Sequence, residues 1–394
     1  MSQQSTVFLG LTLCLALSAC GGGSGGGRDA EPAPAQPSEP AQPATFQTET
    51  VIAGLDHPWS AVFLPDGRML VTERPGRLNL IDPATAQRVQ VSGVPAVVAV
   101  GQGGLLGVAL HPRFADNGWV YLSYSAQGSD GVGTQLGRGR LEGNTLTDFQ
   151  VLFRATPYGA SGEHFGGRIV FDGQGYLFLG LGERGERDRA QDLRDHNGKL
   201  IRLTADGDIP DDNPFANRSD AQGAIYSYGH RNVQGLAVHP GTGRVWLHEH
   251  GPQGGDEINL PEPGRNYGWP IITYGEEYGG GEIGPTHMAG MEQPLYHWTP
   301  SIAPSGMLFY TGSAFPAWRG NLFVGALVGR HLARLTLDGT TIVAEEKLLA
   351  DAGHRIRDVV QGPDGALYLL VDANPAPILR LRPADATGDD ASPP

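Results

Sequence analysis

The chain has 394 residues, a formal net charge of −14, and a high content of glycine and proline, with 59 and 30 residues. The negative charge excludes the phosphate backbone of nucleic acid as the expected partner. Frequent turn residues favour short strands over long helices. The only two cysteines, Cys14 and Cys20, precede the body of the chain, which excludes a disulfide framework, a cysteine zinc site and an iron–sulfur cluster there.

The first twenty residues follow the pattern of a bacterial lipoprotein signal peptide. The apolar run from Val7 to Ala19 is too short to cross a membrane as a helix, but it suits the apolar segment of a signal peptide. It ends in Leu17-Ser18-Ala19-Cys20, which resembles a lipobox, although residues 1–6 lack the usual basic start. We expect residues 1–19 to be cleaved and Cys20 to carry a lipid in the periplasmic space of the bacterial cell envelope. Cleavage nearby as an ordinary secretory signal is the alternative.

Two polar segments flank the body of the chain. Residues 20–45 and 383–394 consist mainly of Gly, Pro, Ala, Ser and charged residues. Such segments cannot bury enough apolar surface to offset the entropy of ordering them. They predict a flexible tether and a disordered tail on either side of one folded domain over residues 46–382.

A pattern of two short alternating strands around a turn recurs through residues 46–382. Six copies spaced by about 55 residues match the four-stranded blades of a β-propeller, and no long helical periodicity competes. The copies occupy Ala61–Thr72, Gly107–Ser123, Ile169–Gly180, Leu236–His248, Gly306–Gly325 and Val359–Asp372. The sequence therefore predicts an all-β, six-bladed β-propeller with four-stranded blades. A jelly roll or stacked sandwiches are the alternatives.

One glycine-rich segment and one histidine lie in the first half of this domain. The run Gly101–Gly107 is not a dinucleotide-binding loop, because Leu106 replaces the third glycine and a strand follows in place of a helix. His164 lies among small residues directly before a predicted strand, where a neutral imidazole could take up a proton near pH 7. His164 is thus a candidate general base, and a hydrogen-bonded loop histidine is the alternative.

Two further segments follow in the middle of the chain. Gly229–Gly235 contributes an arginine and two amides, either as ligand contacts or as a turn between blades. In His248-Glu249-His250 only two imidazoles share one strand face, which is too few for zinc. The glycine-rich loop after them ends in Asp256 and offers carbonyl and carboxylate oxygens, the ligands that Ca²⁺ prefers.

Arg355 and Arg357 form the last candidate feature. Residues i and i+2 of a strand share one face, so the two guanidiniums would make a fork for a ligand that bears carboxylates. A solvated pair bound to nearby acids such as Asp358 is an equally good interpretation.

These regions, in this order on a six-bladed frame, resemble the soluble quinoprotein glucose dehydrogenases and especially the bacterial aldose sugar dehydrogenases, which use pyrroloquinoline quinone (PQQ). The resemblance runs from Glu49 to Leu381. Its most specific stretches are Gly101–Gly107, Gly229–Gly235, Gly251-Pro252, Asp256–Leu260, Asn266–Pro270, Tyr296–Ser305 and Arg355–Asp358.

The resemblance implies an oxidoreductase that acts on an aldose. His164 would remove the proton of the anomeric hydroxyl while hydride passes to the quinone, which gives a lactone. Arg231 would stabilise charge on the quinone oxygen. The positions that match cofactor-holding residues are Gln102, Asn232, Tyr278, Arg355 and Arg357. The electrons would then pass to an external acceptor, a quinone or a cytochrome.

The resemblance also implies two Ca²⁺ sites. The backbone carbonyls of Gly251 and Pro252 would bind the ion that polarises the quinone. Glu257 and the carbonyl of Tyr267 match a second, structural site.

Two positions depart from the family pattern. Val328 stands where the family has a cofactor-contacting lysine, which Arg330 could replace, and Glu163 stands where relatives often carry Asp or Asn. The missing lysine leaves open a non-catalytic propeller that binds a glycan or a protein. A Ca²⁺-dependent lactonase-type hydrolase is also open, although it needs carboxylates and amides where this sequence places arginines.

Overall fold

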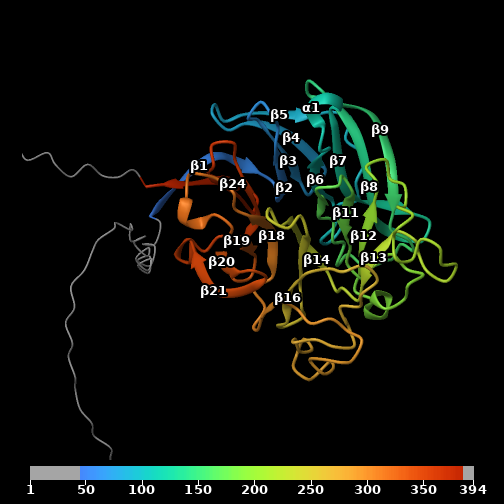
Figure 1. Cartoon of the computed structure of the whole chain (residues 1–394). Coiled ribbons are helices and arrows are strands. Elements are labelled where there is room, and N and C mark those ends of the chain that lie inside the picture. The colour runs from blue at the N-terminus through green and yellow to red at the C-terminus, as the bar shows by residue number, and fades with distance from the viewer. Residues whose placement is uncertain (1–44, 385–394) are drawn as a thin grey trace, which may run out of the picture. The chain divides into compact units, whose positions relative to one another are not determined.

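The computed structural model describes residues 45–384, and the predicted signal peptide, most of the tether and most of the tail lie outside them. Six four-stranded antiparallel sheets follow one another along the chain and form a ring (Figure 1). The predicted six-bladed β-propeller is confirmed. Within the described range, no helix has the length and the apolar character that a membrane span requires.

The first three blades are each built from four consecutive strands. Blade 1 contains β2 (Pro58–Phe63), β3 (Met69–Glu73), β4 (Arg77–Asp82) and β5 (Gln87–Val91). Blade 2 contains β6 (Leu105–Leu110), β7 (Trp119–Gly128), β8 (Gly131–Glu142) and β9 (Thr145–Arg154). Blade 3 contains β10 (Ile169–Phe171), β11 (Leu177–Gly180), β12 (Lys199–Leu203) and β13 (Ile225–Tyr228).

Blades 4 and 5 repeat this order, and blade 6 takes its outer strand from the start of the domain. Blade 4 contains β14 (Val233–Val238), β15 (Val245–Glu249), β16 (Asp256–Asn259) and β17 (Tyr296–Trp298). Blade 5 contains β18 (Pro304–Phe309), β19 (Leu322–Ala326), β20 (Leu332–Asp338) and β21 (Thr341–Leu348). Blade 6 contains β22 (Ile356–Gln361), β23 (Leu367–Val371), β24 (Ala376–Pro383) and β1 (Phe46–Leu55).

The pairing of β1 with β24 closes the ring. The two strands are antiparallel, and Phe46 lies opposite Pro383 in the register. The first strand of the described chain therefore completes the last blade, as Figure 1 shows by the contact of blue and red strands.

The side chains of each blade differ between its inner and outer strands. Inner and middle strands such as β3 and β23 are buried at every position, because both faces of a blade pack against neighbouring blades. The outermost strands β5 and β21 are mostly exposed and carry polar residues. In blades 1 and 5 exposure therefore increases from the buried second strand to the outermost strand.

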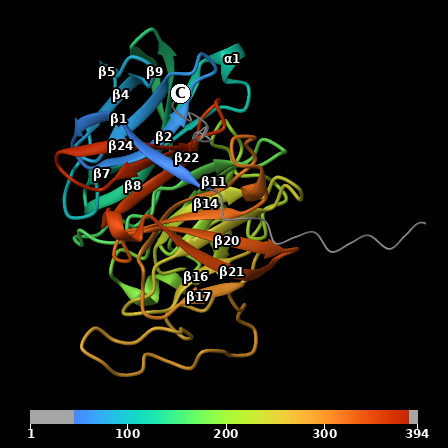
Figure 2. The ribbon, with the colours of Figure 1, turned by 90° about the vertical axis from the view of Figure 1, so that its left-hand side faces the viewer.

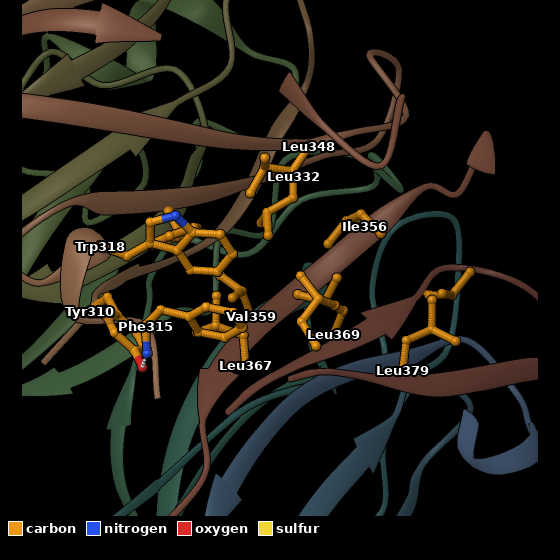
Figure 3. Packing of buried hydrophobic residues seen from close by; sticks show 13 residues of the cluster. Tyr310, Phe315, Trp318, Leu332, Leu348, Ile356, Val359, Leu367, Leu369 and Leu379 are labelled. Atoms are coloured by element: carbon orange, nitrogen blue, oxygen red, sulfur yellow. Dashed lines mark hydrogen bonds between the residues drawn. The ribbon is translucent and has the colours of Figure 1, made fainter. Parts of the chain in front are cut away.

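Six hydrophobic clusters fill the spaces between neighbouring blades, one for each pair around the ring. Figure 3 shows the cluster between blades 5 and 6, where Trp318 and Phe315 stack with ring centroids 3.9 Å apart beside Leu369. The cluster between blades 6 and 1 joins Leu55 and Ile378 to Met69, so ring closure also buries apolar surface.

Between residues 45 and 384, helical structure is confined to single turns: α1 (Phe114–Asn117) and the 3-10 turns Arg187–Ala190, Pro316–Trp318 and Ala350–Ala352. The longest connection, residues 260–295, joins β16 to β17 and extends away from the ring (Figure 2). Glu277 in this loop accepts two hydrogen bonds from the guanidinium of Arg187, which fixes it to blade 3.

Candidate active site

A cavity of about 490 Å³ lies where residues from all six blades converge. Its lining comprises His57, Trp59, Arg74, Gln102, Phe165, Gly166, Asn232, Gln234, His250, Ala303, Leu327, Val328, Arg355, Arg357 and Asp372. Four of the predicted cofactor-binding residues, Gln102, Asn232, Arg355 and Arg357, are among them.

The innermost strands direct side chains into this cavity through β-bulges. Every innermost strand except β10 has a register shift at its N-terminal end. Trp59, Gln234 and Arg357 are the extra residues of three such bulges, and all three line the cavity. A bulge interrupts the regular alternation of side chains along a strand. The extra residue can therefore point into the cavity, although its neighbours in the strand pack between the blades.

His164 lies beside the cavity and is held from two sides. Its Nδ1 lies 2.6 Å from Oε2 of Glu183, and its backbone N–H donates to Oε1 of Gln102 over 3.0 Å. Because an ionised carboxylate can only accept, the neutral form of the imidazole carries its proton on Nδ1 and presents Nε2 as an acceptor. The residue adopts a positive φ of 49°, a strained conformation that the surrounding contacts must maintain. The geometry suits a general base that acts through Nε2.

Arg184 fixes the loop that carries this histidine. Its fully buried guanidinium donates to the carbonyls of Glu163 and Val132, at 2.8 and 2.6 Å, and to that of Ser161. It also stacks 3.5 Å over the ring of Phe165. Burial, together with nearby Arg189, lowers the pKa of Arg184 to about 10. The loop is thus held by a cation that has no ion pair with a carboxylate of the described residues.

Arg355 and Arg357 meet at one carboxylate. Oδ2 of Asp372 lies 3.0 Å from Nη2 of Arg355 and 3.2 Å from Nη2 of Arg357. Burial works to raise the pKa of Asp372, but the two guanidiniums hold it below its ordinary value. Burial lowers the pKa of Arg357 to about 10, which still leaves it charged at neutral pH. The two guanidiniums therefore share a nearby acid, as the alternative interpretation expected, but this acid is Asp372 and not Asp358, and both arginines still line the cavity.

Asp358 instead pairs with Arg168 in a buried ion pair next to the cavity. Arg168 Nη1 lies 2.8 Å from Asp358 Oδ1, and its Nη2 donates to the carbonyl of Arg357 over 2.8 Å. The same guanidinium stacks 4.1 Å over the ring of Trp59. This pair links blades 3, 6 and 1 and orients two residues of the cavity wall.

A second, much smaller cavity of about 10 Å³ adjoins the first at His250. Its lining includes Arg231, Gly251, Glu257 and Tyr267, all predicted for the cofactor or for Ca²⁺. Arg231 Nη1 donates to the carbonyl of Gly251 over 3.0 Å, so this carbonyl already faces a cation.

Two carboxylates, those of Glu249 and Glu257, lie directly opposite each other on β15 and β16 in the wall of the small cavity. Burial, together with the negative charge of Glu249, raises the pKa of Glu257. Glu249 accepts from Nδ1 of His230 over 2.7 Å, whereas Glu257 accepts only from the amide of Asn259. Two facing carboxylates in a space of one water molecule or ion favour a bound cation.

Some predicted residues lie apart from both cavities. Tyr278 is 69% exposed on the long loop, and its hydroxyl is 3.4 Å from Nη2 of Arg231. Pro252 is buried but lines neither space, and Glu163 is exposed and also lines neither. Val328 lines the large cavity at 62% exposure, while Arg330 is exposed outside its lining and does not replace the missing lysine there.

Three residues of the site were not predicted from the sequence: Glu183, Arg184 and Arg74. Glu183 and Arg184 come shortly after the buried strand β11, and such a charged pair close behind an apolar run was the available signal. Arg74 likewise follows β3. The partners of these residues come from other blades or loops, which no local pattern reveals.

The comparisons with known proteins agree with this geometry. The model of the family described as Glucose / Sorbosone dehydrogenase matches residues 55–380. The aldose sugar dehydrogenase of Escherichia coli K12 is 48% identical over 348 residues, which cover 86% of this chain and 94% of that protein.

Two solved structures are also similar. The crystal structure of the soluble aldose sugar dehydrogenase from Escherichia coli in its apo form has a TM-score of 0.84 at 47% identity, covering 86% of this chain and 100% of that one. The PQQ-bound aldose sugar dehydrogenase of Streptomyces coelicolor has a TM-score of 0.72 at 31% identity, covering 86% and 99%. The resemblance inferred from the sequence motifs is thereby confirmed, and the chain belongs to the glucose/sorbosone dehydrogenase family.

Proposed function

We propose that the protein is a PQQ- and Ca²⁺-dependent aldose sugar dehydrogenase that oxidises the anomeric hydroxyl of an aldose to a lactone. The observation that carries the proposal is the His164–Glu183 pair beside a cavity lined by three arginines and a single acid, Asp372. Relatives named aldose sugar dehydrogenase, one of them PQQ-bound, support this choice of chemistry.

The residues of the large cavity suit a polyanionic ring such as PQQ. Arg355 and Arg357 would bind its carboxylates, while Gln102 and Asn232 present amide groups to the same space. Burial lowers the pKa of His250 to about 3, so this histidine of the cavity lining is neutral near pH 7. It therefore adds no positive charge to that of the arginines. Bound PQQ would supply the two-electron oxidising power, because no side chain of the protein can.

His164 is the proposed general base. Its Nε2 would accept the proton of the anomeric hydroxyl as the carbon gives up its hydride, so that the sugar loses two electrons and two hydrogens in total. Glu183 stabilises the imidazolium that this transfer creates and keeps the ring in the correct tautomer. Arg231, whose carbonyl accepts from the backbone N–H of Glu183, would stabilise developing negative charge from the side of the small cavity.

Ca²⁺ is proposed at the carbonyls of Gly251 and Pro252 and, as a structural ion, at Glu257 and the carbonyl of Tyr267. The facing carboxylates of Glu249 and Glu257 supply the hard oxygen donors that this cation needs. The two carboxylates repel each other, and a divalent cation bound between them would neutralise this repulsion. This favours the second site. At the first site the Gly251 carbonyl accepts a hydrogen bond from Arg231, so a bound Ca²⁺ would share this oxygen with the guanidinium or displace it.

The test is reconstitution of the EDTA-treated protein with PQQ, with and without Ca²⁺, followed by dye-linked oxidation of aldoses. Activity should require both additions. The His164→Gln variant should take up PQQ normally and lose turnover by about 10² or more. Absence of PQQ uptake, measured by absorbance after gel filtration, would contradict the proposal.

The cellular setting is also a proposal. We propose a protein anchored through Cys20 in the cell envelope, with electrons leaving to a separate quinone or cytochrome. Labelled palmitate should be incorporated into the wild type and not into Cys20→Ser, and the variant should move to the soluble periplasmic fraction. Equal labelling of both proteins would contradict the anchor.

A further inference from the structure

The charges that line the large cavity are unbalanced. Three guanidiniums, those of Arg74, Arg355 and Arg357, face one carboxylate, that of Asp372. Asp372 is shared by Arg355 and Arg357 through the same oxygen atom. The fork therefore has one positive charge in excess, and Arg74 adds another.

Arg74 is held in place without being neutralised. Its backbone N–H donates to the carbonyl of His57, and its carbonyl accepts from the N–H of Leu105, each over 3.0 Å. Its Nη1 donates to the carbonyl of Gly101 over 2.8 Å. Among residues 45–384 it has no ion pair with a carboxylate. A guanidinium has five N–H donors, so most of its donors remain free for a ligand.

The contact with Gly101 places Arg74 next to the proposed reaction centre. Gly101 precedes Gln102, whose side chain holds the backbone of His164. Gly101 has a positive φ of 57°, and a Cβ there would lie 2.2 Å from the carbonyl oxygen of Gly162, so the two loops touch as only glycine permits. The Arg74 side chain thus lines the cavity from blade 1, the neighbour of the blade that carries the arginine fork.

We propose that Arg74 is a further cofactor-binding residue, whose guanidinium pairs with a carboxylate of the quinone that the fork of Arg355 and Arg357 does not neutralise. The inference rests on the proposed function. A ring with three carboxylates requires more positive charge than the fork leaves after Asp372. Val328 provides none, and Arg330 lies outside the lining.

The experiment measures PQQ affinity in the presence of Ca²⁺ by quenching of tryptophan fluorescence, because Trp59 lines the cavity. The full-length wild type is compared with Arg74→Gln, which keeps a polar N–H donor but has no charge, and with Arg74→Lys, which keeps the charge. Arg330→Gln is the control for loss of an exposed arginine outside the cavity. We expect Arg74→Gln to bind at least about tenfold more weakly, Arg74→Lys to lie between it and the wild type, and Arg330→Gln to match the wild type.

The outcomes separate the inference from the proposed function. If the wild type binds PQQ and Arg74→Gln binds equally well, the inference is overturned and the proposed function stands. Equal losses in the Gln and Lys variants would show that the charge is not what matters, which also overturns it. If the wild type binds no PQQ, both the proposed function and the inference fail. Thermal midpoints within about 2 °C of the wild type would show that the variants fold normally.

Discussion

At the scale of single residues, the reactivity of His164 depends on which atom Glu183 touches. The contact to Nδ1 leaves Nε2 as the proton acceptor. We predict that Glu183→Gln lowers turnover by about 10² or more, because the amide can donate to Nδ1 and so move the ring proton to Nε2. Quinone affinity should be unchanged. Steady-state kinetics would check this, with the exposed Glu163→Gln as the control expected to stay within about twofold of the wild type.

The buried Lys199 is expected to make the stability of the protein depend on pH. Its ammonium group is fully buried and donates to the carbonyls of Arg189 and Asn197, at 2.7 and 2.8 Å. Burial lowers its pKa to about 7 from a model-peptide value of 10.5. Between these two values the unfolded chain carries the proton and the folded one does not, so stability rises as the pH increases from 7 towards 10.

We therefore predict that Lys199→Met abolishes this pH dependence. In the wild type it raises the free energy of unfolding by up to about 1.4 kcal/mol per pH unit in this window. Urea unfolding at several pH values would measure it. Lys347→Met, which removes an exposed lysine of β21, is the matched control and should leave the pH slope unchanged. A wild-type slope in the Lys199 variant would show that the buried amine keeps its proton throughout.

At the scale of elements, the loop between β9 and β10 owes its shape to Arg184. We predict that Arg184→Met lowers the free energy of unfolding by about 3 kcal/mol, because it removes the guanidinium that donates to the carbonyls of Ser161 and Glu163, and it leaves that of Val132 with only the N–H of Gly159. Urea unfolding would check the value. Arg194→Met, which breaks an ion pair whose arginine is 77% exposed, should change it by less than about 0.5 kcal/mol.

The same scale shows what a sequence can and cannot predict. The inner two strands of every blade were predictable, because buried alternating residues around a turn form a strong local pattern. Outer strands such as β21 are exposed and polar, and they carry little signal. The bulges that turn Trp59, Gln234 and Arg357 into the cavity depend on the neighbouring strand's register, which no local pattern encodes. Four of the residues predicted from the motifs line the large cavity. Which of them contact one another depends on the arrangement of the blades.

At the scale of the whole molecule, stability depends on closing the ring. Gln47 of β1 lies opposite Arg382 of β24 in the register. We predict that a disulfide between Gln47→Cys and Arg382→Cys, with Cys14 and Cys20 replaced by serine, raises the free energy of unfolding by about 4 kcal/mol. The oxidised and reduced forms of the same protein, compared by urea unfolding, provide the test. Identical midpoints of the oxidised and reduced forms would contradict the predicted stabilisation.

The pairing of β1 with β24 also means that the ring can close only after the last strand has been synthesised. β1 is among the first segments of the body to be synthesised, and its partner β24 is the last. For nearly the whole of translation β1 has no native partner, and such an unpaired edge is prone to aggregate. Contacts so distant in sequence also form late in folding. A chain that ends before β24 lacks the strand between β1 and β23, so β1 has no partner and the ring cannot close.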